Sequence, residues 1–266
     1  KSKMKNSSIY KFSTLFKTQY ANMLEYRAEI ALWAISGVIP FFMLNIWTNN
    51  GLNESINISN VMLSRYFLSA FFVRQFSVVW VVFTFEEDAL LGRVSPYIIQ
   101  PLHPFLRYFA QHIAEQITRF PFALFIAIFF FIFNPQSLWM PSFLTIIISI
   151  VSIFFSFLIQ FLMQSIIASF CFWTEKASSI EKLLFIPTLF LSGLLAPVSS
   201  FPPYVKSWIY LTPFPYLIDF PASILSGNQA NITEGIFIQF LWIILFFTIF
   251  KKSWKAGTKK FTAMGL

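Results

Sequence analysis

The chain alternates between long apolar runs and short polar segments, and the apolar runs have the lengths of membrane-spanning helices. A helix rises about 1.5 Å per residue, so about 20 apolar residues cross the roughly 30 Å of hydrocarbon in a bilayer. The pattern predicts an all-α integral membrane protein, folded as a single transmembrane domain over residues 1–266. Its six transmembrane helices are predicted at about residues 28–48, 61–85, 117–133, 141–172, 178–196 and 235–250.

Residues 8–27 precede the first span and show a different, amphipathic pattern. Phe12 and Phe16 lie one helical turn apart, while Lys11 and Lys17 occupy the other face. A helix with one apolar and one basic face is typical of the membrane interface. We therefore expect an interfacial helix here. The same residues could also be the start of the first span, and the pattern leaves this alternative open.

Composition and charge agree with a membrane protein. Hydrophobic residues make up 57% of the chain and charged residues only 11%, against about 25% charged residues in soluble domains. The Lys and Arg residues number six up to Arg27, three from Arg93 to Arg119, two in the next inner loop and five in residues 251–266, with Lys206 outside. Cytoplasmic loops carry an excess of Lys and Arg, so both termini are predicted to be cytoplasmic.

This distribution also accounts for the net charge of +8, which is therefore no sign of a nucleic-acid partner. The sequence begins K-S-K-M-K-N-S-S, and no short apolar segment with a small-residue cleavage site follows. We expect no removable signal peptide.

A compact charged segment, residues 86–102 (E-E-D-A-L-L-G-R-V-S-P-Y-I-I-Q-P-L), separates the second and third predicted spans. It opens with three consecutive acids. Gly92 permits a bend, and Pro96 and Pro101 interrupt any continuing helix. The charge distribution places this segment in the cytoplasm. It is either a plain turn or a surface that another protein grips.

Residues 197–234 are rich in proline and aromatic side chains and are semi-apolar, which is unusual for an outer loop. Non-helical backbone at membrane depth is tolerated only where protein or water surrounds it. We predict two short helices, near residues 203–211 and 215–225, that partly dip back into the outer leaflet. The hairpin is marked by Pro197, Pro203, Pro213, Pro215, Pro221 and Gly227.

Three polar residues inside predicted spans are candidates for a substrate pathway. Arg74 lies about 20 Å along its helix from Val61, and a charge near the bilayer centre costs at least about 2.5–3.5 kcal/mol. No acid in the predicted spans is an evident partner, so a structural pairing and a substrate-facing role both stay open. Gln160 and Gln164 lie one turn apart on the fourth span, where polar side chains either join helices or bind a ligand.

The motifs of several enzyme classes are absent from the sequence. It has no G-x-x-x-x-G-K-[ST] phosphate loop, no G-x-S-x-G elbow, no H-E-x-x-H and no paired D-D-x-x-D. The acids of the 86–102 segment lack a second acidic cluster with which to hold Mg²⁺. Cys171 is the single cysteine, and His103 and His112 have no matching ligands nearby. We expect no catalytic, cofactor or metal site in this chain.

Four motifs in order along the chain, one of them made of two stretches, resemble the permease subunits of type-2 ATP-binding-cassette exporters (the ABC-2 type), particularly the small bacterial permeases. The 92–102 stretch looks like the family's G-x-L-x-x-x-L-L-x-P-L, with Val94 in place of the preferred Leu. The others are L-E-Y-R-A-E (24–29), the outer stretches L-S-G-L-L-A-P-V-S-S-F-P-P-Y (191–204) and T-P-F-P-Y-L-I-D-F-P-A-S-I-L-S-G (212–227), and W-K-A-G-T-K-K-F-T-A-M-G (254–265).

The resemblance implies a membrane subunit that pairs with a second copy or a sister permease in the bacterial cytoplasmic (inner) membrane. The substrate pathway would lie at the interface of this dimer, among membrane lipids. Two separate cytoplasmic ABC ATPase subunits would bind ATP and Mg²⁺ and hydrolyse the nucleotide. The missing phosphate loop is consistent with such a division of labour.

The resemblance also makes the interfacial helix and the 86–102 segment the surfaces that the ATPase grips. In that role the acids would meet basic residues of the partner, and apolar side chains would anchor in a groove. The predicted coupling residues are Glu86, Glu87, Asp88, Leu90, Leu91, Gly92, Arg93, Tyr97, Ile98 and Pro101. A non-transporting membrane scaffold for a cytoplasmic complex is the alternative, and an intramembrane enzyme is disfavoured by the missing catalytic clusters. The sequence does not identify the substrate.

Overall fold

The computed structural model describes residues 8–49, 58–228 and 231–263. Residues 1–7, which include three basic residues, residues 50–57 between the first two predicted spans, residues 229–230 and residues 264–266 lie outside these ranges. The described residues are helical and contain no strand. Their helices are α1 (Ser8–Glu25), α2 (Arg27–Ser36), α3 (Ile39–Asn49), α5 (Asn60–Ser77), α6 (Val81–Leu90), α7 (Val94–Ile99), α8 (Phe105–Phe133), α9 (Phe143–Ser169), α10 (Ser178–Leu191), α11 (Pro203–Tyr210), α12 (Asp219–Leu225) and α13 (Ile232–Ala263).

Within the described residues, five helical stretches are long and apolar enough to cross a membrane: 28–49, 60–90, 105–133, 143–172 and 232–261. They include five of the six predicted spans. The remaining helix, α10, has 14 residues and so a length of about 21 Å, less than a bilayer core requires. The two short helices predicted near residues 203–211 and 215–225 correspond to α11 and α12, and their location on the outer side stays a prediction. The residues predicted as a basic tail continue α13 to Ala263 as helix.

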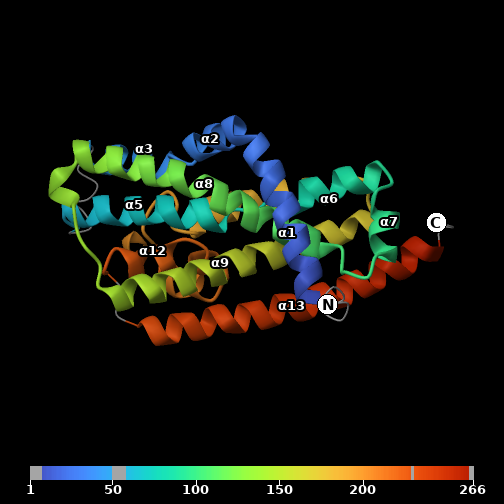
Figure 1. Ribbon diagram of the computed structural model, residues 1–266. Coiled ribbons are helices and arrows are strands. Elements are labelled where there is room, and N and C mark those ends of the chain that lie inside the picture. The colour runs from blue at the N-terminus through green and yellow to red at the C-terminus, as the bar shows by residue number, and fades with distance from the viewer. Residues whose placement is uncertain (1–7, 50–57, 229–230, 264–266) are drawn as a thin grey trace.

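The long helices α5, α8, α9 and α13 run side by side, and α1 crosses them obliquely (Figure 1). α13 packs along α9, α12 packs against both α5 and α9, and α1 packs on α8. The described C-terminal end of α13 lies near α7, whereas α12 lies at the opposite end of the bundle. The predicted coupling segment and the predicted outer hairpin are therefore at opposite ends of one bundle.

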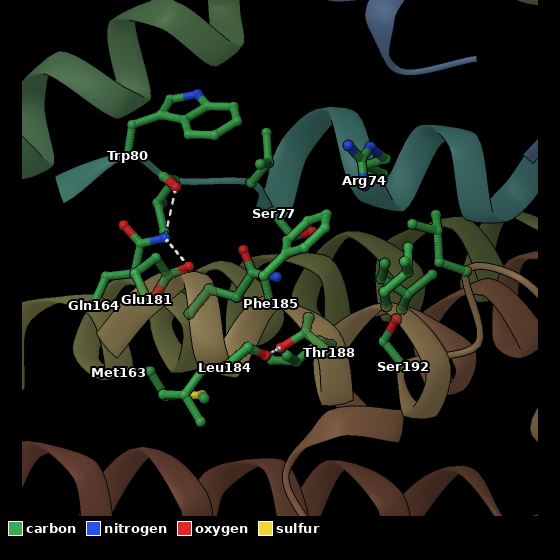
Figure 2. A pocket seen from close by; sticks show the side chains of 17 residues that line it. Arg74, Ser77, Trp80, Met163, Gln164, Glu181, Leu184, Phe185, Thr188 and Ser192 are labelled. Atoms are coloured by element: carbon green, nitrogen blue, oxygen red, sulfur yellow. Dashed lines mark hydrogen bonds between the residues drawn. The ribbon is translucent and has the colours of Figure 1, made fainter. Parts of the chain in front are cut away.

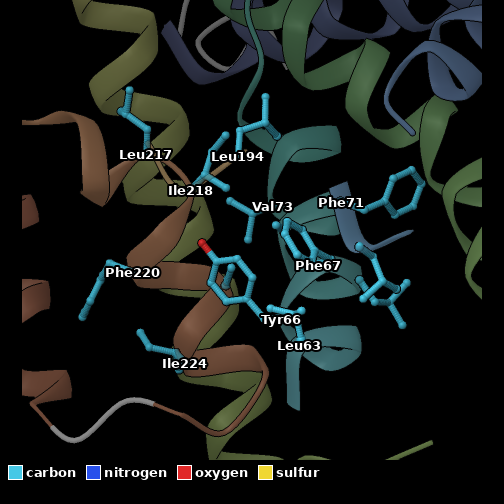
Figure 3. Packing of buried hydrophobic residues seen from close by; sticks show 14 of the residues in the cluster. Leu63, Tyr66, Phe67, Phe71, Val73, Leu194, Leu217, Ile218, Phe220 and Ile224 are labelled. Atoms are coloured by element: carbon cyan, nitrogen blue, oxygen red, sulfur yellow. The ribbon is translucent and has the colours of Figure 1, made fainter. Parts of the chain in front are cut away.

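Two buried clusters hold these helices together. The first contains Leu63, Phe67 and Phe71 of α5, packed against Ile218 and Ile224 from the outer region (Figure 3). The second, nearer α7, mixes aliphatic and aromatic side chains and contains Phe85, Phe105, Tyr108, Phe172 and Phe250. Lipid tails are as apolar as these side chains, so the clusters hold the helices together mainly through close van der Waals packing. Between the two clusters lies an interruption in the second span.

This interruption comprises residues 78–80, which separate α5 from α6. Two side chains from other helices satisfy its backbone. Gln164 donates from Nε2 to the Val79 carbonyl oxygen over 2.9 Å, and the Trp80 N–H donates to His112 Nε2 over 2.8 Å. Lipid supplies no hydrogen bonds, so such partners are a condition for non-helical backbone at membrane depth.

The first span also has a break, between α2 and α3 at Gly37. There the Gln75 side chain approaches so closely that a Cβ on residue 37 would clash with its Nε2 atom. That amide donates to the Ala34 carbonyl oxygen over 2.9 Å. Glycine at this position allows α5 to seat a polar side chain against the broken end of α2.

We predict that Gln164→Leu destabilises the fold and that Gln160→Leu does not. Gln164→Leu removes the partners of the interrupted backbone, and leaving a buried polar group unpaired costs about 1–3 kcal/mol in the free energy of unfolding. Gln160 lies one turn away on α9 and makes no hydrogen bond with the described residues, so it is a matched control. Thermal unfolding of the purified chain in detergent measures the difference. An equal loss in both variants would show that the interruption does not depend on Gln164.

Candidate functional site

The 86–102 segment forms a folded corner with helix on both sides of its glycine. α6 ends at Leu90, residues 91–93 turn, and α7 follows from Val94 to Ile99. Gly92 adopts φ 72°, a left-handed conformation that is favourable for glycine and strained for most other residues. The Arg93 N–H donates to the Asp88 carbonyl oxygen over 2.8 Å, which satisfies the end of α6.

Two of its three acids are bonded within the chain. The Ser178 N–H and Oγ–H donate to the two carboxylate oxygens of Glu86 over 2.7 and 2.9 Å. Asp88 is 6% exposed, accepts from the Tyr108 hydroxyl over 2.8 Å and pairs with Arg93 at 3.3 Å. Only Glu87, of these three acids, has an exposed side chain. Glu86 and Asp88 therefore shape the corner, and Glu87 is available to a partner.

The apolar residues of the corner divide in the same way. Leu90 and Leu91 are 66% and 56% exposed, and Ile99 is 84% exposed. Tyr97 and Ile98 are half-buried, and the Arg107 guanidinium lies 4.6 Å from the Tyr97 ring centroid. Ile99 was missed as a coupling candidate.

A helical phase for α7 would have identified Ile99, because Val94 and Ile98 lie one turn apart on its inner face. Of the other predicted coupling residues, Gly92, Arg93 and Pro101 are exposed. The corner therefore presents a mixed apolar and charged outer surface.

The corner is braced from behind by aromatic rings. Phe105, at the start of α8, lies with its ring centroid 4.8 Å from that of Phe250 and 5.2 Å from that of Trp254, both on α13. His103 lies 5.1 Å from the same Trp254 ring. The basic end of α13 is thus part of the support of the corner, which accounts for its continuing as helix beyond the predicted span.

The three pathway candidates line one cavity of about 90 Å³, here called the Arg74 cavity (Figure 2). Arg74 comes from the last turn of α5, and Gln160 and Gln164 come from α9. The interruption at residues 78–80 forms one wall, and α10 forms another. The structure therefore brings together residues that the sequence placed on two separate spans. Their role in transport stays a prediction.

Arg74 differs from the other arginine in this part of the bundle. Arg119 on α8 pairs with Glu115 one turn earlier and donates to the Gln75 carbonyl oxygen over 3.0 Å. The Arg74 side chain has no hydrogen bond or ion pair with any residue in the described ranges. The sequence left two roles open for Arg74, a structural pairing and a substrate-facing role. The described residues provide no partner for the structural pairing.

Residues that the sequence did not single out as pathway candidates complete the cavity wall. Glu181 is near the start of α10, Ser77 ends α5, and Ser192 follows α10. The sequence predicted no role for Glu181. Only the contact between α10 and the interruption reveals that it faces the same cavity as Gln164, whose Nε2 donates to it over 3.0 Å.

The corner and the cavity are joined through α10. Glu86 binds the first residue of α10, and Glu181 lies one turn further along the same helix. The Gln164 amide bonds both to Glu181 and to the interrupted backbone. A displacement of the end of α6 would therefore act directly on a helix that lines the cavity.

The outer hairpin residues are placed at the other end of the bundle. Pro203 begins α11, Pro215 lies in a short 3-10 turn before α12, and Pro221 is buried within α12. Asp219 is buried and accepts from the Tyr66 hydroxyl over 2.8 Å and from the Val198 N–H over 2.9 Å. The other predicted positions, Pro197, Pro213 and Gly227, lie in the connections between the short helices.

The chain's helices and motifs are matched by a known family. No curated protein and no solved structure matches the chain. The family model described as ABC-2 family transporter protein covers residues 61–265, from the second span to the end of the tail. This match confirms the resemblance drawn from the motifs, and with the five membrane-length helices it makes the chain a multi-pass membrane protein that belongs to the ABC-2 transporter family.

Proposed function

We propose that this chain is the transmembrane permease subunit of an ATP-driven exporter, coupled to separate cytoplasmic ATPase subunits that bind ATP and Mg²⁺. Family membership supports the proposal, and the missing phosphate loop is consistent with an energy source on another chain. The observation that carries it is the corner at residues 86–102. Its exposed Leu90, Leu91 and Ile99 lie on a turn that is hydrogen-bonded to α10 through Glu86 and to α8 through Asp88, as a surface that receives a mechanical push must be.

The topology we propose has six crossings, with both termini and the 86–102 segment in the cytoplasm of a bacterial cell. α10 is too short to cross alone, so residues 192–197 would complete the fifth crossing as non-helical backbone. Their bonding suits membrane depth. The Asp219 N–H donates to the Ser192 carbonyl oxygen over 2.7 Å, and Trp47 Nε1 donates to that of Leu195 over 3.0 Å. α11 and α12 would then form the re-entrant outer hairpin.

In the working assembly, two such subunits, identical or sister permeases, would enclose the substrate pathway at their interface. Closure of the ATPases on ATP would push the corner. Glu86 would pass this displacement to α10, and the Glu181–Gln164 bond would pass it to the interruption in the second span. Arg74, Gln160 and Gln164 would then change their exposure to the pathway. The proposal needs no catalysis in this chain.

We predict that Glu87→Lys combined with Leu91→Asp greatly weakens ATPase binding without unfolding the chain. Both side chains are exposed, and central apolar anchors of an interface often contribute 2 kcal/mol or more. The retained ATPase should fall at least about tenfold. Copurification of the ATPase with the tagged permease measures this, and thermal unfolding confirms that the variant is folded.

Leu138→Asp is the matched control, because Leu138 is 63% exposed at the opposite end of the bundle. It should retain the ATPase. Unchanged association in the double variant would reduce the 86–102 segment to a plain turn. If no ATPase copurifies with the unmodified chain and vesicles show no ATP-dependent flux, a membrane scaffold replaces the exporter.

We predict that Glu86→Ala uncouples transport while ATPase association persists. The substitution leaves the start of α10 without its carboxylate partner, a loss of about 1 kcal/mol for a helix N-terminus. Flux per ATP hydrolysed should fall about fivefold or more, the lower end of ordinary coupling between sites. Glu87→Ala should give the opposite pattern, with weaker association and an unchanged unfolding temperature. Weaker ATPase association in Glu86→Ala, with unchanged unfolding, would contradict the assignment of Glu86 to α10.

A further inference from the structure

The Arg74 cavity contains hydrogen-bond donors that have no acceptor. The Oγ atoms of Ser77 and Ser192 are fully buried and have no hydrogen-bond partner among the described residues, and the two residues are 1% and 0% exposed. Both line the cavity, as does Arg74 (Figure 2). A third hydroxyl of the wall, that of Thr188, already donates to the Leu184 carbonyl oxygen over 2.8 Å. The hydroxyls of Ser77 and Ser192 make no such bond to a helix carbonyl among the described residues.

The positive charge of Arg74 favours a negatively charged ligand for these donors. A guanidinium at membrane depth needs a counter-charge or water, and no described acid lies within ion-pair distance of it. Glu181 belongs to the same wall, but it accepts from Gln164. The donors that remain are one guanidinium and two hydroxyls, which together suit an acceptor with several oxygens and negative charge.

The volume of the cavity limits the ligand. One water molecule needs about 10–15 Å³ of such space, so about 90 Å³ admits a small cluster of waters or one tetrahedral oxyanion. A larger cargo could place only an anionic group there. The Gln160 amide, which also lines the cavity and has no described partner, would supply a further donor.

We propose that the Arg74 cavity binds a phosphate-type oxyanion through the Arg74 guanidinium and the hydroxyls of Ser77 and Ser192. The anion is either a free ion or the phosphate headgroup of a lipid. The inference deepens the proposed export function, and rests on it, in treating this anion as part of the cargo. Binding itself requires neither ATPase nor transport. A failed binding test would therefore leave the permease proposal standing, whereas a missing ATPase partner would leave the anion site standing.

The test is the unfolding temperature of the full-length chain in a non-ionic, phosphate-free detergent. The probes are inorganic phosphate and dihexanoyl phosphatidic acid. Dihexanoyl glycerol, which has the same acyl chains but no phosphate, is the control. A ligand that binds only the folded state raises the unfolding temperature in a saturable manner. We expect the unfolding temperature to rise by about 3 °C or more at saturation with at least one phosphate probe, and not to rise with dihexanoyl glycerol.

Arg74→Met should weaken binding at least about tenfold, and the double variant Ser77→Ala with Ser192→Ala should also weaken it. Arg65→Met is the matched control, because Arg65 lies on the same helix, donates to the Leu138 carbonyl oxygen and is outside the cavity. It should bind as the unmodified chain does. The serine variant keeps the test decisive if Arg74→Met does not fold.

A response to inorganic phosphate would identify a free-anion site, and a response confined to phosphatidic acid would identify a headgroup site. Equal responses in the unmodified chain and in both cavity variants would overturn the proposal. So would the absence of any response to both phosphate probes.

Discussion

The second span depends on one constraint, which is that its interrupted backbone must find hydrogen-bond partners without water or lipid. Residues 78–80 leave the helix, and Gln164 and His112 supply the missing partners from α9 and α8. An unpaired group in hydrocarbon costs several kcal/mol. The break is therefore stable only while these three helices keep their register. What could look like a defect in one helix fixes the relative positions of three.

The same constraint places the cavity and gives it a mechanical connection. Because Gln164 also bonds to Glu181, α10 is held beside the break, and the space between them is the Arg74 cavity. Glu86 holds the beginning of α10 from the corner at residues 86–102. A corner bonded in this way has little freedom to absorb a push by bending. Force applied to its outer surface would move α10 or break named hydrogen bonds, and both outcomes can be measured.

The length and polarity of the apolar runs predicted six spans, of which five correspond to membrane-length helices, and also predicted two short helices near residues 203–225 and the bend at Gly92. The interruption could not be predicted, because Val78, Val79 and Trp80 are apolar and include neither glycine nor proline. Apolar residues of this kind occur equally in an unbroken membrane span, so the hydrophobicity pattern does not distinguish an interrupted helix from a continuous one. The sequence also did not show that Glu86 and Asp88 are bonded within the chain while Glu87 is exposed. Glu86 faces inward because it bonds to the first residue of α10, and this contact depends on the tertiary structure.

A comparison of Arg119 with Arg74 shows where local sequence is sufficient to predict a pairing. Arg119 has Glu115 four residues before it, on the same face of α8, so its pairing could have been read from spacing alone. Arg74 has alanine, phenylalanine, serine and valine at the positions three and four residues away on either side. No acid from another described helix replaces that missing partner. Its charge must therefore be met by water, by a neighbouring subunit or by a ligand. The two orphan serine hydroxyls in the same wall favour a ligand with oxygens to share.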